Sequence, residues 1–466
     1  MQVKSLQLKH VLHFSNITLN FDYTNAPITL ILGNQGSGKT TLLRFCYQSL
    51  TWFAARQRDI RTAGLVMLDQ DIMHNRLQSK VEIKVHFPEE IGSFPESSDL
   101  SDVSKQDCTW QMYKTLNSQG VGLSKVETQQ LESMLNLYQT ALKKDPLLGL
   151  PLIAYYPAER FVNEVNLISK NNPLIFQPTH AYELTAIPFT TFARFFEWFR
   201  EISDIENAQS TATIQSILKH AQNDQSSTDA ITEHLAKMTA NVHAPSLQSF
   251  KDALAIIVPE VSDLYLKYHP KLQLMVGYQN TVMNFQQLPN SIRNWVALVG
   301  DVVRRLCILN PNSLFPCQEG NGILMIDAID HQLDQDHAST ILNRLHQAFP
   351  NVQIIATAHR EELLEHAHDF QCLRLENKKL LPIQLEANQF QLEQIYAELT
   401  TNIVKDDTNS AVDALIEPIT ETVSVTSMFE SIQQLLSAEQ QQELKNLLEH
   451  AQDSSSPNTS KSRFNP

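Results

Sequence analysis

The segment GNQGSGKT, at residues 33–40, holds three of the chain's 12 glycines. It fits the phosphate-binding pattern G-x-x-x-x-G-K-[ST] at every fixed position. The apolar run ITLIL (28–32) precedes it, and residues 41–58 follow with apolar side chains at helical spacing. A buried strand, a glycine-rich loop and a helix in this order predict a nucleotide-binding loop at the end of one strand of a sheet.

Each position of this loop has a chemical reason. Glycine at its three positions lets the backbone turn so that its N–H groups face phosphate oxygens. The Lys39 ammonium is expected at the β- and γ-phosphates, and the Thr40 hydroxyl at Mg²⁺. The predicted nucleotide-binding residues are Gly33, Asn34, Gln35, Gly36, Ser37, Gly38, Lys39, Thr40 and Thr41.

A second strand-end motif lies in NGILMIDAID, residues 321–330. Four apolar residues run into Asp327, which is how a buried strand delivers a carboxylate to a magnesium-nucleotide site. The flanking segments are predicted helices at 294–309 and 338–349 and a strand at 352–359. Strands that alternate with helices predict a parallel sheet covered by helices, and therefore an α/β fold.

The middle of the chain is poor in glycine and reads as helical. Residues 190–209 carry aromatic side chains at helical spacing, which favours a helix packed in the core. A hairpin is expected from 271–278 and 281–287, with Gln279 and Asn280 at its turn. The predicted organisation is an N-terminal half of the nucleotide-binding lobe (1–95), a mainly helical insertion lobe (96–270), the C-terminal half of the nucleotide-binding lobe (271–385), a C-terminal helical segment (386–452) and a disordered tail (453–466).

Composition narrows the setting in which the chain works. The formal net charge of −15 gives no support to a broadly nucleic-acid-binding surface, although a local basic strip is not excluded. The five cysteines show no metal-ligand spacing, and no apolar run is long enough to span a bilayer. The N-terminus lacks the apolar segment of a secretory signal. We therefore expect a cytoplasmic protein without a membrane partner.

The order of these motifs resembles that of the ABC-type ATPases of the RecF, SMC and OLD group, including the AAA-domain proteins of bacterial Septu-type defence systems. The resemblance covers about residues 1–400, and the segments EWFREISDIEN and YYPAER (155–160) also look like parts of that group's insertion. It implies a P-loop NTPase fold of ABC type: a mixed sheet flanked by helices, with a large helical insertion and a C-terminal helical segment. It also implies ATP and Mg²⁺ as ligands.

The resemblance assigns roles to residues of the second half. Asp327 corresponds to the aspartate that orders Mg²⁺, and His359 to the switch histidine near the γ-phosphate, so both are expected to be catalytic. Leu333 and Asp334 correspond to the pair that faces a partner subunit across the interface. The site that the resemblance implies is therefore completed by a second subunit.

One departure from the group's pattern lies in the segment LPNSIR, residues 288–293. The serine that normally contacts the γ-phosphate bound to the other subunit is replaced by Pro289, which has neither a hydroxyl nor an N–H to donate. Ser291 would take its place only after a small shift of register. The expected residues of the trans interface are therefore Ser291, Arg293 and Asp334.

The other departure lies beside the magnesium ligand. The glutamate that usually follows Asp327 and handles the attacking water is replaced by Ala328. A methyl group can neither polarise a water nor accept its proton, and removal of a general base costs about 10² to 10⁴ in rate. Asp330, two residues on, is the substitute that the sequence offers, although it could lie past the strand end.

These features lead to two hypotheses. The first is an ATP-dependent sensor or regulator of a bacterial defence or DNA-maintenance system, acting as a homo- or hetero-dimer or higher oligomer with an effector, such as a nuclease, on another chain. The second is a scaffold or switch that binds ATP without hydrolysing it. A nuclease site within this chain is disfavoured, because the D-x-D pairs at 69–71 and 334–336 read as surface acids at turns.

Overall fold

The computed structural model divides the chain into two compact units, Met1–Phe390 and Gln391–Pro466. It describes residues 1–383, apart from 95–104, 118–119, 163–164, 166, 168–177, 183–188, 191, 224–244 and 332. The predicted C-terminal helical segment (386–452) and tail (453–466) lie outside the described residues. No helix in the described part of the chain is both long and apolar enough to cross a membrane.

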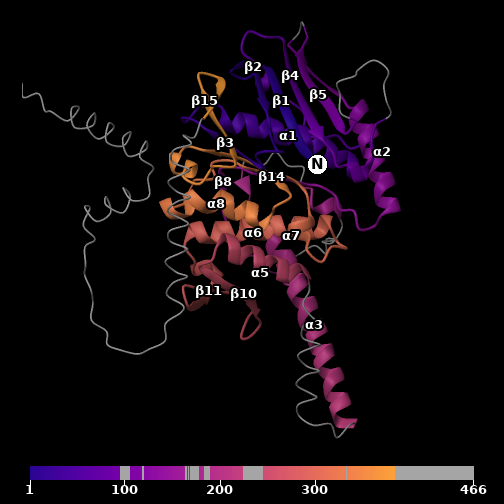
Figure 1. The fold of residues 1–466 in the computed structure, drawn as a ribbon, viewed down its shortest axis with the longest axis vertical. Coiled ribbons are helices and arrows are strands. Elements are labelled where there is room, and N and C mark those ends of the chain that lie inside the picture. Colours follow the sequence, from indigo (N-terminus) through magenta and orange to yellow (C-terminus); the bar gives the residue numbers. More distant parts are fainter. Residues whose placement is uncertain are drawn as a thin grey trace, which may run out of the picture. The chain divides into compact units, whose positions relative to one another are not determined.

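A six-stranded sheet forms the centre of the first unit (Figure 1). Its order is β16-β15-β3-β14-β13-β7, and every neighbouring pair is parallel except β15 with β16. Parallel order brings the carboxyl ends of the strands to one edge, where ligands bind in such sheets. The strands are β3 (Ile28–Leu32), β7 (Leu152–Tyr156), β13 (Gly322–Ile326), β14 (Val352–Ala358), β15 (Phe370–Glu376) and β16 (Lys379–Pro382).

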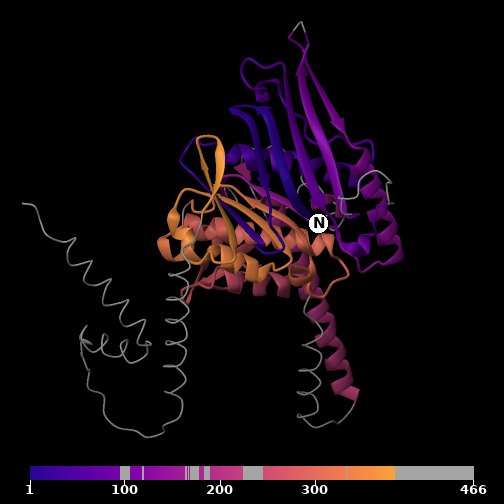
Figure 2. The same ribbon diagram turned by 45° about the horizontal axis from the view of Figure 1, so that its top comes forward.

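An antiparallel sheet of five strands, in the order β2-β1-β4-β5-β6, forms a second layer in the N-terminal part (Figure 2). Strand β5 reads DCTWQMYKTL, and its Cys108, Trp110 and Met112 are buried while the residues between them are more exposed. This alternation of period two defines a half-buried strand. The strands are β1 (Gln2–Val11), β2 (Phe14–Asn20), β4 (Gln78–His86), β5 (Asp107–Leu116) and β6 (Gly122–Glu127).

Strands as well as helices lie within the expected mainly helical lobe at 96–270. Strands β5 and β6 continue the sheet that β1 and β4 begin, and β7 belongs to the central sheet. The predicted boundary at residue 95 therefore falls between two strands that pair with each other along their whole length. The low glycine content of this region suggested helix, but the apolar alternation of β5 is the stronger local signal.

Helices cover the central sheet and extend from it (Figures 1 and 2). Helix α6 is buried over most of its length, since every residue from Asn294 to Leu309 is buried. The helices are α1 (Lys39–Arg58), α2 (Gln129–Lys144), α3 (Ala193–Asn223), α5 (Pro245–Ile257), α6 (Asn290–Leu309), α7 (Pro316–Glu319) and α8 (Gln335–Ala348). Short 3₁₀ turns span Asp69–Asp71, Glu89–Ile91, Pro178–His180, Phe285–Gln287 and Glu361–Leu364.

The predicted aromatic helix and hairpin both form. Phe195, Phe196 and Phe199 of α3 are fully buried, and Phe195 and Phe199 both pack against Phe250 of α5. The hairpin turn falls at the expected two residues between β11 and β12, which both adopt the left-handed backbone. The remaining strands are β8 (Glu159–Arg160), β9 (Phe189–Thr190), β10 (Val261–Lys267), β11 (Gln273–Tyr278) and β12 (Thr281–Asn284).

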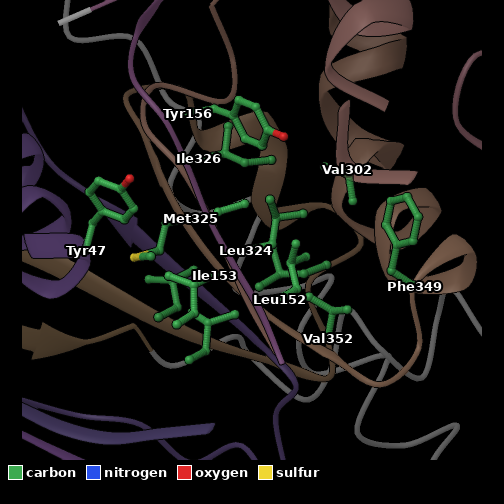
Figure 3. Packing of buried hydrophobic residues seen from close by; sticks show 14 of the residues in the cluster. Tyr47, Leu152, Ile153, Tyr156, Val302, Leu324, Met325, Ile326, Phe349 and Val352 are labelled. Atoms are coloured by element: carbon green, nitrogen blue, oxygen red, sulfur yellow. The ribbon is translucent and has the colours of Figure 1, made fainter. Parts of the chain in front are cut away.

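The interior strand β13 anchors the core on both sides. All five of its residues are buried, and the Ile326 end lies beside Tyr156 of β7 (Figure 3). Its other neighbour, β14, is also buried throughout. A strand buried on both faces has no exposed position for a polar side chain. The first polar side chain after β13 is therefore Asp327, just past its end, and this residue is itself buried.

A buried ionic cluster joins α6 to β7. Asp301 accepts hydrogen bonds from Arg304 Nε at 2.9 Å, Arg305 Nε at 2.8 Å and the Tyr156 hydroxyl at 2.8 Å. Burial alone would raise the pKa of Asp301, but the two guanidinium groups hold it well below its usual value. The cluster therefore stays ionised in the folded protein.

Asp301→Asn is expected to destabilise the protein by about 3–5 kcal/mol, because it removes the buried negative charge that both guanidinium groups contact. Since the folded-state pKa of Asp301 is depressed, its stabilising contribution is present above the unfolded pKa of about 3.9 and is lost as pH falls through the lower folded value. Urea unfolding at several pH values, followed by circular dichroism, measures both effects. Glu127→Gln breaks an exposed pair with Lys125 and should change stability by less than about 1 kcal/mol.

Candidate functional site

The glycine-rich loop lies between β3 and α1, as its sequence predicts. Gly36 and Gly38 have φ values of +78° and +108°, which side chains other than glycine rarely adopt. A Cβ atom at Gly38 would also collide with His13 and Phe14. The loop conformation therefore depends on glycine at both positions.

Lys39 occupies the loop that it is expected to use for phosphate. Its ammonium donates to the carbonyl oxygens of Gly33 and Asn34, the latter at 3.1 Å, and lies 3.4 Å from Nδ1 of His359. Burial lowers the pKa of Lys39, and the carboxylates of Asp327 and Asp330 oppose that shift. The lysine is thus preformed beside the loop and next to the predicted switch histidine.

Asp327 lies directly after β13 and presents one uncommitted oxygen. Its Oδ1 accepts a hydrogen bond from the Thr357 hydroxyl, whereas its buried Oδ2 has no hydrogen-bond partner among the described residues. A buried carboxylate oxygen without a partner is costly unless a cation or water completes it. Carboxylate and hydroxyl oxygens are hard ligands of the kind Mg²⁺ prefers, so Asp327 and the exposed Thr40 fit a magnesium ion.

Thr357 of β14 fixes the geometry beside this carboxylate, and the sequence reasoning missed it. Its hydroxyl accepts a hydrogen bond from the Ala328 N–H at 2.9 Å while donating to Asp327. The residue lies in the run IIATA just before His359. A polar residue inside this otherwise apolar run was the available signal, because such a residue needs a partner when it is buried.

Arg160 is the second residue that sequence reasoning left without a role. Its guanidinium donates to the carbonyl oxygens of Pro157 at 3.1 Å, Asp327 at 2.6 Å and Ala328 at 2.9 Å. Burial lowers the pKa of Arg160 to about 10, so it remains charged at neutral pH. The arginine that ends the motif YYPAER is buried, and it holds the backbone after β13 through the carbonyls of Asp327 and Ala328.

Ala328 is held in an unusual backbone conformation. Its φ is +45°, and both its N–H and its carbonyl are bonded, to Thr357 and Arg160 respectively. A non-glycine residue in this region is strained and persists only where its surroundings fix it. The turn that usually carries the glutamate is therefore formed, with a methyl group in its place.

Asp330 binds backbone N–H groups, whereas its position in the sequence suggested a role as a general base. Its Oδ2 accepts the backbone N–H groups of His359 at 2.8 Å and Arg360 at 2.9 Å. The side chain is buried, so this carboxylate orients the segment that carries the predicted switch histidine. The expectation that Asp330 substitutes for the missing glutamate gains no support from this geometry.

Most of the predicted site residues line one cavity of about 360 Å³. Asp327, Ala328 and His359 line it together with residues of the glycine-rich loop. His13, from the turn between β1 and β2, also lines it, and its buried Nε2 has no hydrogen-bond partner among the described residues. The loop residues that line the cavity are Gln35, Gly36, Ser37, Gly38, Lys39, Thr40 and Thr41.

The residues expected at a trans interface lie elsewhere. Ser291 and Asp334 line a separate cavity of about 30 Å³, and Arg293 donates to Gln286 and Asn290. None of the three lines the cavity of the glycine-rich loop. Within one chain they therefore do not complete that site, and α6 begins at Asn290 with Pro289 in the preceding position.

Asp334 caps α8 and binds a histidine. Its Oδ1 accepts from the His337 N–H at 2.9 Å and lies 2.6 Å from Nδ1 of the same residue, whose Nε2 lies 2.8 Å from Glu260. Burial alone would lower the pKa of His337, but the two carboxylates raise it above its usual value. This contact ties the loop after β13 to the start of β10.

The D-x-D pair at 69–71 is structural, but it is not a pair of surface acids. Asp71 is buried and forms an ion pair with Arg44 of α1 at 2.7 Å, and its Oδ2 accepts from the Leu68 N–H at 2.8 Å. The ion pair with an arginine offsets part of the free-energy cost of removing this carboxylate from water. In the described residues no group of three or more His, Cys, Asp or Glu side chains could hold a metal ion.

Comparison with protein families matches residues 5–243, just over half of the chain, to the family described as AAA domain. The chain belongs to the AAA-domain family. This membership agrees with the glycine-rich loop and with the parallel central sheet.

Two curated relatives of this AAA-domain protein carry the description of probable ATPase. The Retron Ec83 probable ATPase of Escherichia coli is 24% identical over 397 residues, which cover 78% of this chain and 69% of the relative. The Retron Vc95 probable ATPase of Vibrio cholerae serotype O1 biovar El Tor is 24% identical over 362 residues, covering 73% and 67% respectively.

Among solved structures, the Smc head domain bound to the C-terminal domain of ScpA, derived from Pyrococcus furiosus, aligns with a TM-score of 0.44 and 13% identity. The alignment covers 85% of this chain and 99% of that one. Similarity at this level is too low to support a conclusion about this AAA-domain protein.

Asp330→Ala is expected to free the backbone N–H groups of His359 and Arg360 and to cost about 1–3 kcal/mol of stability. Hydrogen exchange at these two amides should become faster than in the wild type, and urea unfolding measures the stability change. Asp336→Ala removes an exposed acid from the neighbouring helix and should leave both amides unchanged. Unaltered exchange in the Asp330 variant would contradict its positioning role.

Proposed function

We propose that this AAA-domain protein binds Mg-ATP in the cavity of the glycine-rich loop. The unpartnered Oδ2 of Asp327 carries this proposal, because it is a buried anionic ligand aimed into a cavity that also holds Lys39 and Thr40. Bound Mg²⁺ would supply positive charge at the β- and γ-phosphates. Lys39 exchanges its loop carbonyls for phosphate oxygens, and His359, 3.4 Å from Lys39, senses the γ-phosphate.

We further propose that nucleotide state controls an effector on another polypeptide. Both curated relatives are described as probable ATPases of retrons, which supports a role in bacterial antiviral defence. Asp330 provides a means of control, because it links the loop after β13 to the segment that contacts Lys39. A change at the γ-phosphate would thereby reach the exposed loop after the strand. This role makes the protein a nucleotide-dependent sensor or regulator.

A second subunit is part of the proposal. Ser291, Arg293 and Asp334 lie outside the nucleotide cavity of their own chain, as residues serving a neighbour's nucleotide would. Pro289 removes one hydroxyl and one N–H from that contact. A homodimer or a heteromer with intact motifs on its other chain is compatible with this placement, and sedimentation with and without ATP distinguishes them from a monomer.

The alternative function is an ATP-binding switch that does not hydrolyse its nucleotide. Ala328 is the observation that favours it, because the turn that normally presents a glutamate is intact and presents a methyl group. Such a switch would be reset by nucleotide dissociation or by a partner subunit.

Lys39→Ala should weaken ATP binding by about 10- to 100-fold, since a charged contact to phosphate contributes about 1.5–3 kcal/mol. Asp327→Asn should retain nucleotide affinity without Mg²⁺ and lose the increase that Mg²⁺ brings. Calorimetric titration with ATP, with and without Mg²⁺, measures both. Lys125→Ala, at an exposed lysine far from the loop in sequence, serves as the control. Equal affinity in wild type and the Lys39 variant would overturn the proposal.

The alternative function makes its own prediction. Wild-type protein that binds Mg-ATP should release phosphate no faster than Lys39→Ala, and Ala328→Glu should bring release above that baseline. Placing a carboxylate on the existing turn adds no new backbone strain, because alanine already occupies the left-handed conformation. Phosphate release by wild-type protein above the Lys39→Ala rate would rule this alternative out.

A further inference from the structure

A second cavity, of about 470 Å³, adjoins the cavity of the glycine-rich loop. The two share Ala158, Ala328 and His359. The second cavity therefore begins where the loop cavity ends, beside the missing glutamate and the predicted switch histidine. A water that attacks the γ-phosphate would reach it from this side, opposite Lys39 and the glycine-rich loop.

One carboxylate that lines the second cavity makes no hydrogen bond or ion pair with the described residues. Ala328 offers a methyl group, and the Oδ2 of Asp330 is occupied by two backbone N–H groups. Glu159 lines the same cavity and is exposed to solvent, and its carboxylate has no hydrogen-bond or ion-pair partner in the described part of the chain. The other titratable groups on the cavity wall are His331, His359 and Arg360.

The backbone around Glu159 is fixed against the strand that carries Asp327. Strands β7 and β13 are parallel with Ile326 opposite Tyr156, and the Asp327 N–H donates to the Tyr156 carbonyl at 2.9 Å. The next residue after Glu159 is Arg160, whose guanidinium holds the carbonyls of Asp327 and Ala328. The contacts of Arg160 therefore hold the backbone of Glu159 close to Ala328, where the usual glutamate is missing.

We propose that Glu159 is the catalytic carboxylate that replaces the missing glutamate at position 328. The inference rests on the proposed binding of Mg-ATP in the adjoining cavity. The glutamate reaches the attacking water from the neighbouring chain segment instead of from the turn after β13. The departure at Ala328 then relocates the general base without removing it.

The step that Glu159 serves is hydrolysis of the γ-phosphoryl group. The water oxygen forms a bond to the γ-phosphorus while the bond from that phosphorus to the bridging oxygen breaks. The electron pair of the broken bond stays on the β-phosphate of ADP, and the Glu159 carboxylate accepts the water proton. That proton then passes to the released phosphate or to solvent, which restores the carboxylate.

The test is phosphate release and ATP binding by the full-length protein with Mg-ATP. Glu159→Gln keeps the size of the side chain and removes its basicity, and we expect phosphate release to fall about 10² to 10³-fold. Affinity for ATP should stay within about threefold. Glu159→Asp should give an intermediate rate, and Glu159→Gln combined with Ala328→Glu should recover release, which a purely structural role would not produce.

Two controls separate Glu159 from its surroundings. His331→Gln changes another exposed titratable side chain of the cavity, and Glu127→Gln changes an exposed glutamate on β6. Circular dichroism verifies that each variant is folded. Full activity in Glu159→Gln, or loss of activity in His331→Gln alone, overturns the proposal.

The binding measurement keeps this proposal distinct from the function on which it rests. Wild-type protein that binds ATP but releases no phosphate above the Lys39→Ala rate overturns the role of Glu159 and leaves the binding function standing. Wild-type protein that binds no ATP overturns both. Loss of release with retained binding in Glu159→Gln supports both.

Discussion

The arrangement of the site depends on hydrogen bonds that join the ends of parallel strands. Arg160, just past β7, binds the two carbonyls that follow β13, and Thr357 of β14 binds the side chain and the N–H of the same turn. These contacts hold Asp327 and Ala328 in one geometry, including the positive φ of the alanine. Without them, the strands would still pair, but the carboxylate past β13 would have no defined direction.

The sequence was sufficient for the parts of this fold that rest on local pattern. The glycine-rich loop, the buried strand before Asp327 and the aromatic helix α3 each follow from the spacing of residues along the chain. Low glycine content in residues 96–270 predicts helix but does not reveal the strands there, one of which follows from the alternation of Cys108, Trp110 and Met112. The spacing of apolar residues indicates whether a segment is a helix or a strand, whereas composition gives only an average preference for one of them.

The parts of the site that sequence reasoning missed are contacts between distant segments. Thr357 and Arg160 act on Asp327 from 30 and 167 residues away, and nothing in their local sequence specifies that target. The two backbone partners of Asp330 become apparent only once β13 and β14 are paired. The function of a side chain depends on the groups that it contacts. In a parallel sheet these groups belong to segments far apart in the sequence, so the order of residues does not identify them.

The Asp301 cluster has a mechanical consequence. Helix α6 begins beside Pro289, at the end expected to face a second subunit, and Asp301 lies three turns along it. There it is tied to Tyr156, four residues before Arg160, by a single buried hydrogen bond. Helix α6 is thus connected to β7 at this point. A displacement of α6 would be transmitted through Tyr156 toward Arg160 and its contacts with the carbonyls of Asp327 and Ala328.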